Sequence, residues 1–415
     1  MVIQNKSGQF YSPRVALLWT NFGPYHVARA RALAGVVDLT TIEFAKRQEL
    51  YGWDAWKADL KSHVVLYRGA YESANPISLS GVLWQRLSAL RPDVLLVPGY
   101  GTLAALSASL WGRRHNCLNI LMSESTVEDQ ERRSMRERLK SILVTQLFDG
   151  AFVSGKRTAE YVRALGMPEA AIARKYGAVD NDSFIRVAEH IRAGTLQVPP
   201  LFLYVGRLAR EKNLESLLRE FSSYRDAGGS WVLRLVGRGP LEESMKKLAD
   251  DLKIRDQVSF AGFKESTDLA AEYARAGCFV LASLSEPWGL VVNEAMASGL
   301  PVVVSRRCGS TDDLVIEQEN GFIFDPGCPG ELSQIMLTVS ALPPDRVRQM
   351  GRRSQEIVSN YSVESWAHSV VELLRLLLDR RSSGHREYGP IPPQDRGPST
   401  FDASAAAAPE VSIKQ

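Results

Sequence analysis

The sequence predicts an α/β protein with two domains, each a parallel β-sheet covered by helices on both faces. Three observations support this prediction: short apolar runs alternate with helical patterns, the alternation stops once in the middle of the chain, and it then starts again. Apolar strands separated by amphipathic helices are typical of parallel sheets that are buried on both faces. With 415 residues, the chain is long enough for two domains that each bury a core.

Each predicted strand is a short apolar run, and in the first half each run is followed by a helical pattern. There the expected strand and helix pairs are 15–20 with 26–35, 93–98 with 102–112, 118–123 with 131–148, and 150–155 with 157–165. In the second half the expected strands are 201–206, 231–237, 258–262, 278–283 and 301–305. Because these runs have no polar face, we expect helices on both sides of each sheet.

The alternation breaks near residues 186–200, where the helical pattern is lost and two prolines follow. A segment of this kind is typical of a linker between domains. We therefore predict an N-terminal domain over residues 1–188 and a C-terminal domain over residues 198–360.

The end of the chain contains one more helical pattern and then a segment of different composition. The pattern over about 363–380 follows the last predicted strand, and we expect this helix to return to the N-terminal domain. Residues 382–415 are rich in Pro, Ser and Ala and poor in large apolar side chains. Burial of such a segment cannot offset the entropy lost by ordering it, so we predict a disordered tail.

Composition and charge argue against several classes of protein. The formal net charge of +3 is too small to predict nucleic acid as the main partner. The four cysteines and six histidines are scattered, which predicts reduced thiols in a cytoplasmic protein and neither a disulfide framework nor a metal site. The chain starts without a signal-peptide core, and no run approaches the roughly 20 apolar residues of a membrane span. We expect any membrane contact to be peripheral.

The stretch SEPWGLVVNEAMASG, residues 285–299, places two glutamates on either side of a turn. It follows the predicted strand 278–283, and ligands of open parallel sheets bind outside the carboxyl ends of the strands. Glu286 lies at the mouth of the turn. Glu294 lies roughly one and a half turns into the helix that follows, where its carboxylate can accept two hydrogen bonds from a diol such as ribose.

The helix in this stretch is expected to begin near Gly289. The N–H groups of Gly289, Leu290 and Val291 would then be free and would face a ligand, and the glycine would let the backbone approach it closely. Free amides combined with the positive end of a helix favour a phosphate site.

Two cations follow the first predicted strand of the second half. In YVGRLAREKN the strand ends before Arg207, and Lys212 comes at the start of the next helix. Two positive charges at one strand end can neutralise a diphosphate and stabilise it as a leaving group.

Together these segments resemble the signature of the retaining glycosyltransferases of GT-B fold, group 1 (family 4). The resemblance rests on the E-x7-E pattern with G-L inside it and on the GRL…EKN segment. It implies that Glu294 binds the ribose hydroxyls of a nucleotide sugar, that Glu286 contacts the transferred sugar, and that the backbone between them holds the diphosphate. It also implies that Arg207 and Lys212 bind the donor phosphates.

Two further segments of the second half are similar to that family in order and spacing. LRLVGRGP matches V-G-x-G-P, and VSFAG matches V-x-F-x-G. The resemblance implies that Gly237 allows close backbone approach and that Phe263 and Lys264 border the base.

In the first half the match is looser. Gly23 and His26 follow the first strand, where the family keeps a glycine-containing loop that faces the donor phosphates and the acceptor. Glu124 follows the predicted strand 118–123, where many relatives carry a His or an acidic residue close to the reacting sugar. The resemblance makes these three residues candidates. A helix-start histidine without a catalytic part is an equal interpretation of His26.

The resemblance implies two Rossmann-like domains that face each other across a cleft. It implies a transferase that moves a sugar from a UDP- or GDP-sugar to a hydroxyl with retention of the anomeric configuration. No cofactor or divalent metal is expected, because the cations of the protein neutralise the diphosphate. The expected acceptor is a glycan or a lipid-linked glycan, in the assembly of an exopolysaccharide, a capsule or a lipid-linked glycan.

Other interpretations stay open. A nucleotide-sugar epimerase can share this architecture, and a nucleotide-sugar-binding protein without catalytic activity would carry the same motifs. GYGTLA, residues 99–104, follows a strand as in dinucleotide-binding dehydrogenases. The basic helix 131–148 has cationic and apolar faces, which suits either an ordinary surface helix or contact with anionic lipid on the inner face of a membrane.

Overall fold

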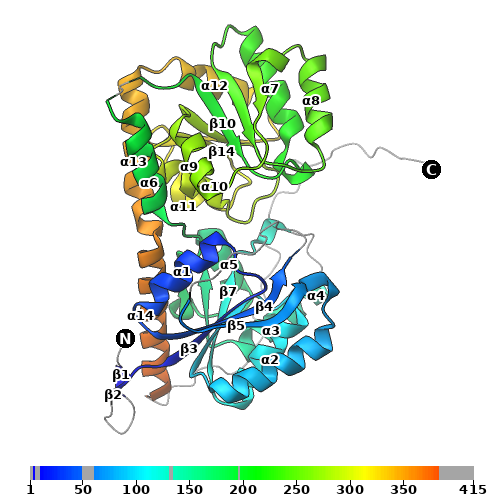
Figure 1. Cartoon of the computed structure of the whole chain (residues 1–415), viewed down its shortest axis with the longest axis vertical. Coiled ribbons are helices and arrows are strands. Elements are labelled where there is room, and N and C mark those ends of the chain that lie inside the picture. The colour runs from blue at the N-terminus through cyan, green and yellow to red at the C-terminus, as the bar shows by residue number, and fades with distance from the viewer. Residues whose placement is uncertain (1–2, 5–9, 49–59, 130–133, 195–196, 383–415) are drawn as a thin grey trace, which may run out of the picture.

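The computed structural model describes residues 3–4, 10–48, 60–129, 134–194 and 197–382. Two α/β domains lie one above the other, each built around a parallel sheet (Figure 1), and this confirms the predicted fold class. Most of the predicted tail, from residue 383 onward, lies outside the described residues.

The N-terminal sheet has seven parallel strands in the order β5-β4-β3-β6-β7-β8-β9. The strands are β3 Arg14–Trp19, β4 Asp38–Arg47, β5 His63–Ala70, β6 Val94–Pro98, β7 Leu118–Ser123, β8 Gly150–Val153 and β9 Ile172–Ala173. A separate antiparallel pair joins β1 Ile3–Gln4 to β2 Phe10–Tyr11. The apolar runs did not reveal β4 and β5, because polar residues such as Glu43 and His63 interrupt them.

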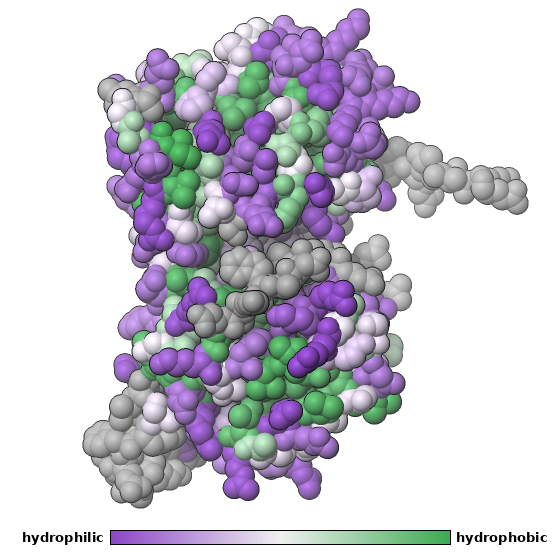
Figure 2. Space-filling model, viewed as in Figure 1, coloured by the Kyte–Doolittle hydropathy of each residue, from purple (hydrophilic) through white to green (hydrophobic). Residues whose placement is uncertain are grey.

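The first half of the chain also contains helices, and all except α6 pack on this sheet or on one another. They are α1 Pro24–Ala34, α2 Pro76–Leu90, α3 Leu103–Arg114, α4 Ser134–Leu147, α5 Lys156–Ala164 and α6 Asn181–Arg192, with the 3₁₀ turns η1 Tyr71–Ser73, η2 Val127–Asp129 and η3 Glu169–Ala171. Helix α2 packs on α3. Figure 2 shows apolar side chains gathered over α2 and α3.

The C-terminal sheet has six parallel strands in the order β12-β11-β10-β13-β14-β15. The strands are β10 Leu201–Val205, β11 Val232–Val236, β12 Val258–Phe260, β13 Cys278–Leu281, β14 Val302–Ser305 and β15 Gly321–Phe324. The helices are α7 Leu214–Asp226, α8 Glu242–Asp251, α9 Ser266–Ala274, α10 Leu290–Ala297, α11 Thr311–Leu314, α12 Glu331–Ser340, α13 Pro344–Val358 and α14 Val363–Ser382, with η4 Arg210–Lys212, η5 Arg255–Gln257 and η6 Ser359–Tyr361. All five predicted strands of this half are present.

Two helices connect the domains. Helix α6 follows the N-terminal sheet but packs on α9 and α10, and its Phe184 lies in the core of the C-terminal domain. Helix α14 runs alongside the N-terminal domain in Figure 1 and packs on α1 of that domain. Trp366 and Leu374 of α14 are fully buried in the N-terminal core. Each domain thus receives a helix from the part of the chain that follows the other domain.

The strand order places a switch point near the middle of each sheet. Connections leave β3 and β6 in opposite directions in the N-terminal sheet, and β10 and β13 in opposite directions in the C-terminal sheet. Loops diverge at such points, so the carboxyl ends of these strands leave a crevice for a ligand. Among the described residues no helix is long and apolar enough to cross a membrane.

Candidate functional site

The switch point of the C-terminal sheet carries an ion pair between two predicted site residues. Lys212 ends η4 in the loop after β10, and Glu286 lies in the loop after β13. The ammonium of Lys212 donates a hydrogen bond to Oε2 of Glu286, and the two side chains are only 15% and 13% exposed. A backbone hydrogen bond also joins the two loops: Leu284 N donates to Glu211 O over 2.9 Å. Both residues follow the carboxyl ends of strands, as expected from the sequence, but the sequence did not predict that their side chains meet.

Arg207 lies beside this pair but is oriented differently. Its guanidinium donates to Glu211, four residues along the chain, and the side chain is half exposed. Tyr204 holds the backbone at this point by donating to the Arg207 carbonyl over 2.8 Å. Each of the two cations is therefore paired with a carboxylate, and an anion of higher charge could exchange for either carboxylate.

Helix α10 begins as the turn predicts. Gly289 is its N-cap with φ +90, a left-handed conformation that an L side chain rarely adopts, and an added Cβ would lie 2.9 Å from Cys308 Sγ. Within the described residues no acceptor is found for the N–H groups of Gly289, Leu290 and Val291. Unsatisfied amides at a helix N-terminus are suited to bind an anion.

Glu294, also on α10, is completely buried. Its Oε2 accepts a hydrogen bond of 2.6 Å from Tyr273 on α9, and its Oε1 accepts one from Tyr25 on α1 of the other domain. Burial raises the pKa of Glu294 from 4.5 to about 7, although both tyrosine hydrogen bonds oppose the rise. The structure therefore covers the carboxylate that the sequence pattern assigns to ribose.

The backbone at the end of the neighbouring strand β10 leaves room only for glycine at position 237. Its φ is +141, and a Cβ there would lie 1.9 Å from the carbonyl oxygen of Gly206. The group that comes close to Gly237 in this structure is therefore the backbone at the end of β10. Phe263, after β12, is 55% exposed. Lys264 beside it is partly buried. An exposed aromatic ring at the same edge of the sheet offers a flat surface for a base.

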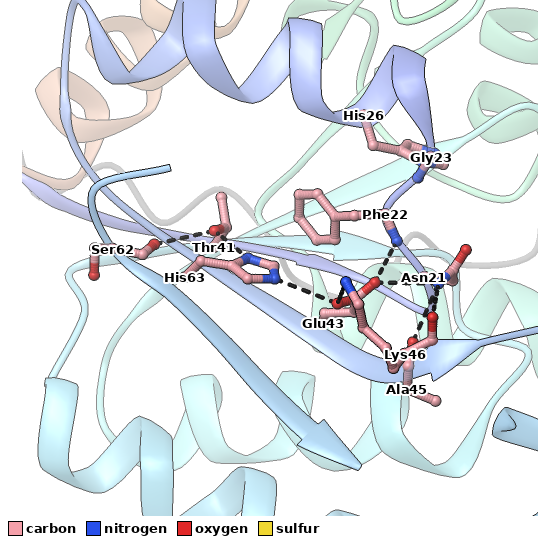
Figure 3. A network of polar contacts seen from close by, with 10 residues as sticks. All are labelled: Asn21, Phe22, Gly23, His26, Thr41, Glu43, Ala45, Lys46, Ser62 and His63. Carbon is pink, nitrogen blue, oxygen red and sulfur yellow. Dashed lines mark hydrogen bonds and ion pairs between the residues drawn. The ribbon is translucent and has the colours of Figure 1, made fainter. Parts of the chain in front are cut away.

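The loop after β3 is held by a buried carboxylate in the N-terminal domain (Figure 3). Glu43 on β4 is fully buried, and its Oε1 accepts hydrogen bonds from Asn21 Nδ2 over 3.1 Å and from Phe22 N over 2.8 Å. Its Oε2 lies 3.4 Å from Lys46 Nζ and 3.3 Å from His63 Nε2. These contacts fix the backbone that enters α1. No sequence motif indicated Glu43.

Gly23 and His26 form the cap of α1. The Gly23 N–H donates to His26 Nδ1 over 3.1 Å, and the His26 ring lies 4.4 Å from that of Trp19 between centroids. Burial, with the neighbouring Arg29 guanidinium, lowers the pKa of His26 to about 3. The imidazole is therefore neutral at physiological pH and contributes a hydrogen bond to the helix cap without a positive charge for phosphate.

Glu124, after β7, is partly buried and lies near two buried side chains of its own domain, Arg29 and Tyr176. Arg29 is 1% exposed and donates from Nε and Nη2 to the carbonyl of Ala178 over 2.9 and 2.7 Å. The carboxylate of Glu124 acts on Arg29 and Tyr176: burial, and then the charge of Glu124, raises the pKa of Tyr176 to about 12. Glu124 thus lies beside a buried cation of its own domain.

Trp288 takes part in a contact between the two domains that the sequence pattern did not indicate. The indole is buried, and its Nε1 donates to Asn293 Oδ1 over 3.0 Å. Asn293 Nδ2 in turn donates to the carbonyl of Gly177 in the N-terminal domain over 3.0 Å. A Cβ at Gly177 would lie 2.2 Å from the indole nitrogen, so glycine is needed for this contact.

A second domain contact lies next to Glu286. Arg157, at the start of α5, donates to both carboxylate oxygens of Asp312 over 2.7 and 2.8 Å. A small cavity of about 40 Å³ opens beside this pair. It is lined by Thr126, Glu128, Arg157, Leu284, Ser285, Glu286, Arg307 and Gly309. The domains therefore meet around Glu286. Among the described residues there is no group of three or more His, Cys, Asp or Glu side chains that could hold a metal ion.

Comparison with known proteins identifies the C-terminal domain. Residues 188–357 match the family model described as glycosyl transferases group 1. This domain belongs to that family. The group 1 domain includes Lys212, Glu286, Glu294 and the start of α10.

Relatives of known name are similar to the group 1 domain and to part of the rest. Sulfoquinovosyl transferase SQD2 of Arabidopsis thaliana is 34% identical over 166 residues, which are 39% of this chain and 30% of that protein. The chain spans less than half of the length of the first relatives that it matches. A GDP-mannose-dependent alpha-(1-6)-phosphatidylinositol dimannoside mannosyltransferase of Mycobacterium tuberculosis is 27% identical over 335 residues, 75% of this chain and 79% of that protein.

Solved structures support the fold of the whole chain. The structure of Anabaena Alr3699/HepE in complex with UDP and glucose superposes on this chain with a TM-score of 0.68 and 17% sequence identity. The match covers 87% of this chain and 99% of the HepE chain. The structure of sucrose-phosphate synthase from Thermosynechococcus elongatus has a TM-score of 0.67 at 19% identity, and it covers 88% of this chain and 99% of that chain. The chain therefore has the GT-B fold, with two Rossmann-like domains.

Proposed function

We propose that the protein is a glycosyltransferase that moves a sugar from a nucleoside diphosphate sugar to a hydroxyl acceptor. One observation carries the proposal: the Lys212–Glu286 pair lies beside the unsatisfied amides at the start of α10, at the switch point of the group 1 domain. A cation and free amides provide a site for a diphosphate, and a carboxylate at its edge can bind sugar hydroxyls.

The proposed reaction uses charges that the protein already places in the cleft. Negative charge develops on the diphosphate as the bond to the sugar breaks, and groups that are positioned for this charge lower the barrier. Lys212, Arg207 and the amides of α10 would supply this stabilisation, so the proposal needs no divalent metal. Glu286 would exchange its contact with Lys212 for contacts with the sugar.

We propose retention of the anomeric configuration, with the leaving phosphate taking the proton of the acceptor hydroxyl. This route needs no side-chain base next to the reacting carbon. The N-terminal domain would bind the acceptor, and the acceptor would reach the sugar past the cavity beside Glu286, which residues of both domains line.

A lipid-linked acceptor would bring the protein to a membrane surface, and α4 fits this part of the proposal. Met135, Leu139 and Ile142 lie on one face of this helix and are 85%, 58% and 51% exposed. Arg136 and Arg138 lie between them in the sequence. Exposed apolar side chains combined with arginines favour contact with anionic lipid. We propose a UDP- or GDP-sugar donor and a role in exopolysaccharide, capsule or lipid-linked glycan assembly.

The test is a transfer assay with the full chain, a panel of UDP- and GDP-sugars, and short glycan or lipid-linked acceptors. The measured quantity is the release of nucleoside diphosphate. We expect release that depends on the acceptor for one donor, and a product with the anomeric configuration of that donor. Nucleotide binding without release for every donor and acceptor would identify a binding protein. A free sugar product formed without an acceptor would identify an epimerase.

A further inference from the structure

Glu294 offers no free surface to a ligand in this structure. The carboxylate is completely buried, and a tyrosine donates to each of its oxygens. Tyr273 belongs to the same domain as Glu294, whereas Tyr25 reaches it from the second residue of α1 across the cleft. A donor that uses this carboxylate must therefore displace a side chain, and only Tyr25 can leave by movement of one domain relative to the other.

The position of Tyr25 is fixed by its own domain. Asn21 Nδ2 and Phe22 N, just before it, donate to the buried Glu43 carboxylate. The Gly23 N–H is bound by His26 Nδ1, which sets the first turn of α1. Because the backbone on both sides is fixed, the phenol of Tyr25 reaches Glu294 as part of a rigid element.

Chemically, the phenol supplies what a ribose hydroxyl supplies. A neutral O–H donates to one carboxylate oxygen in either case. Burial and the neighbouring Glu294 charge raise the pKa of Tyr25 well above its ordinary value, so the phenol keeps its proton. Occupation of Oε1 by Tyr25 and by a ribose diol is therefore mutually exclusive while the carboxylate stays buried.

We propose that Tyr25 is a further residue of the donor site, which occupies the place of a ribose hydroxyl on Glu294 and competes with the nucleotide. The inference rests on the proposed function, because it takes a nucleoside diphosphate as the ligand. Donor binding then requires the Tyr25–Glu294 contact to open, and the apparent affinity is reduced by the fraction of molecules in which it is closed. Loss of the phenol hydroxyl removes the competitor and leaves the buried carboxylate without its partner in the closed state.

The test compares Tyr25→Phe with Tyr273→Phe and the wild type in calorimetric titrations of the full chain with UDP and with GDP. Both variants lose one hydroxyl on the same carboxylate, but only the first loses a contact between domains. A hydrogen bond to a charged group corresponds to roughly 10-fold or more in an equilibrium constant, so Tyr25→Phe is expected to bind the preferred nucleotide about 10-fold more tightly. Tyr273→Phe is expected to bind it no more tightly than the wild type.

A second measurement follows the domains without nucleotide. Small-angle scattering of Tyr25→Phe is expected to give a larger radius of gyration than the wild type, because the closed state has lost a contact, and Tyr273→Phe is expected to give no increase. Wild-type binding with equal or weaker binding by Tyr25→Phe would overturn the inference and leave the proposed function standing. Absence of UDP and GDP binding in all three proteins would overturn both.

Discussion

Replacement of Lys212 by Ala tests the central step of the proposed mechanism, in which this cation stabilises the leaving diphosphate. In the wild type its ammonium binds Glu286, and both side chains are largely shielded from water. Electrostatic interactions are stronger in such a place than on an open surface. Removal of one positioned group that stabilises developing charge costs roughly 100- to 1,000-fold in kcat, and we expect a loss of this size for Lys212→Ala.

The same substitution leaves Glu286 without its cation, which lowers the free energy of unfolding by about 1–2 kcal/mol and does not abolish the fold. The assay is steady-state release of nucleoside diphosphate by the full chain, with urea unfolding in parallel. Lys246→Ala is the matched control, because Lys246 also forms ion pairs with two glutamates but lies on α8 away from the cleft. Turnover of Lys212→Ala near the wild-type rate would refute the assignment, as would an equal loss in Lys246→Ala.

Four further predictions follow from the site. Glu286→Gln keeps the shape of the side chain and removes its charge; transfer should fall by at least roughly 100-fold while the circular dichroism spectrum stays unchanged, and an active variant would exclude Glu286 from the site. Phe263→Ala should raise the KM for the donor about 10-fold with little change in kcat, since loss of base stacking costs roughly 1–3 kcal/mol, and an unchanged KM would place the base elsewhere. Gly237→Ala should lower the free energy of unfolding by about 2 kcal/mol or more, because its Cβ would meet the Gly206 carbonyl, and unaltered urea unfolding would contradict this. Folding raises the pKa of Glu294 from 4.5 to about 7, so the native state becomes less stable as the pH rises through this range. Between pH 5 and pH 8 the free energy of unfolding of the wild type should fall by about 2.5 kcal/mol relative to that of Glu294→Gln. Parallel dependence of the two unfolding free energies on pH would show that the carboxylate is not buried.

The sequence predicted the second domain better than the first, for a physical reason. Strands such as β13 and β14 are buried on both faces and contain only apolar residues up to their ends, so the pattern is visible without other information. Strand β4 is also buried, but it carries Glu43, which is compensated by Asn21, Phe22 and His63. Those partners are distant in the sequence, and no local pattern identifies them.

The same limit applies to the site. The apolar runs placed Lys212 and Glu286 after strand ends, at the edge of the sheet where ligands bind, but they did not predict the ion pair between the two side chains. The burial of Glu294 depends on Tyr25, which lies 269 residues away and in the other domain. The chemistry of His26 depends on its depth and on Arg29, which remove the positive charge that its residue type suggests. Contacts of this kind arise from how the domains pack.

The most direct test of the account is a crystal structure of the full chain with UDP or GDP bound. We expect the diphosphate within hydrogen-bonding distance of the N–H groups of Gly289, Leu290 and Val291, with Lys212 turned from Glu286 toward a phosphate oxygen. A diphosphate bound elsewhere on the molecule, or a complex in which the Lys212–Glu286 pair and the start of α10 do not touch the nucleotide, would contradict the central claim.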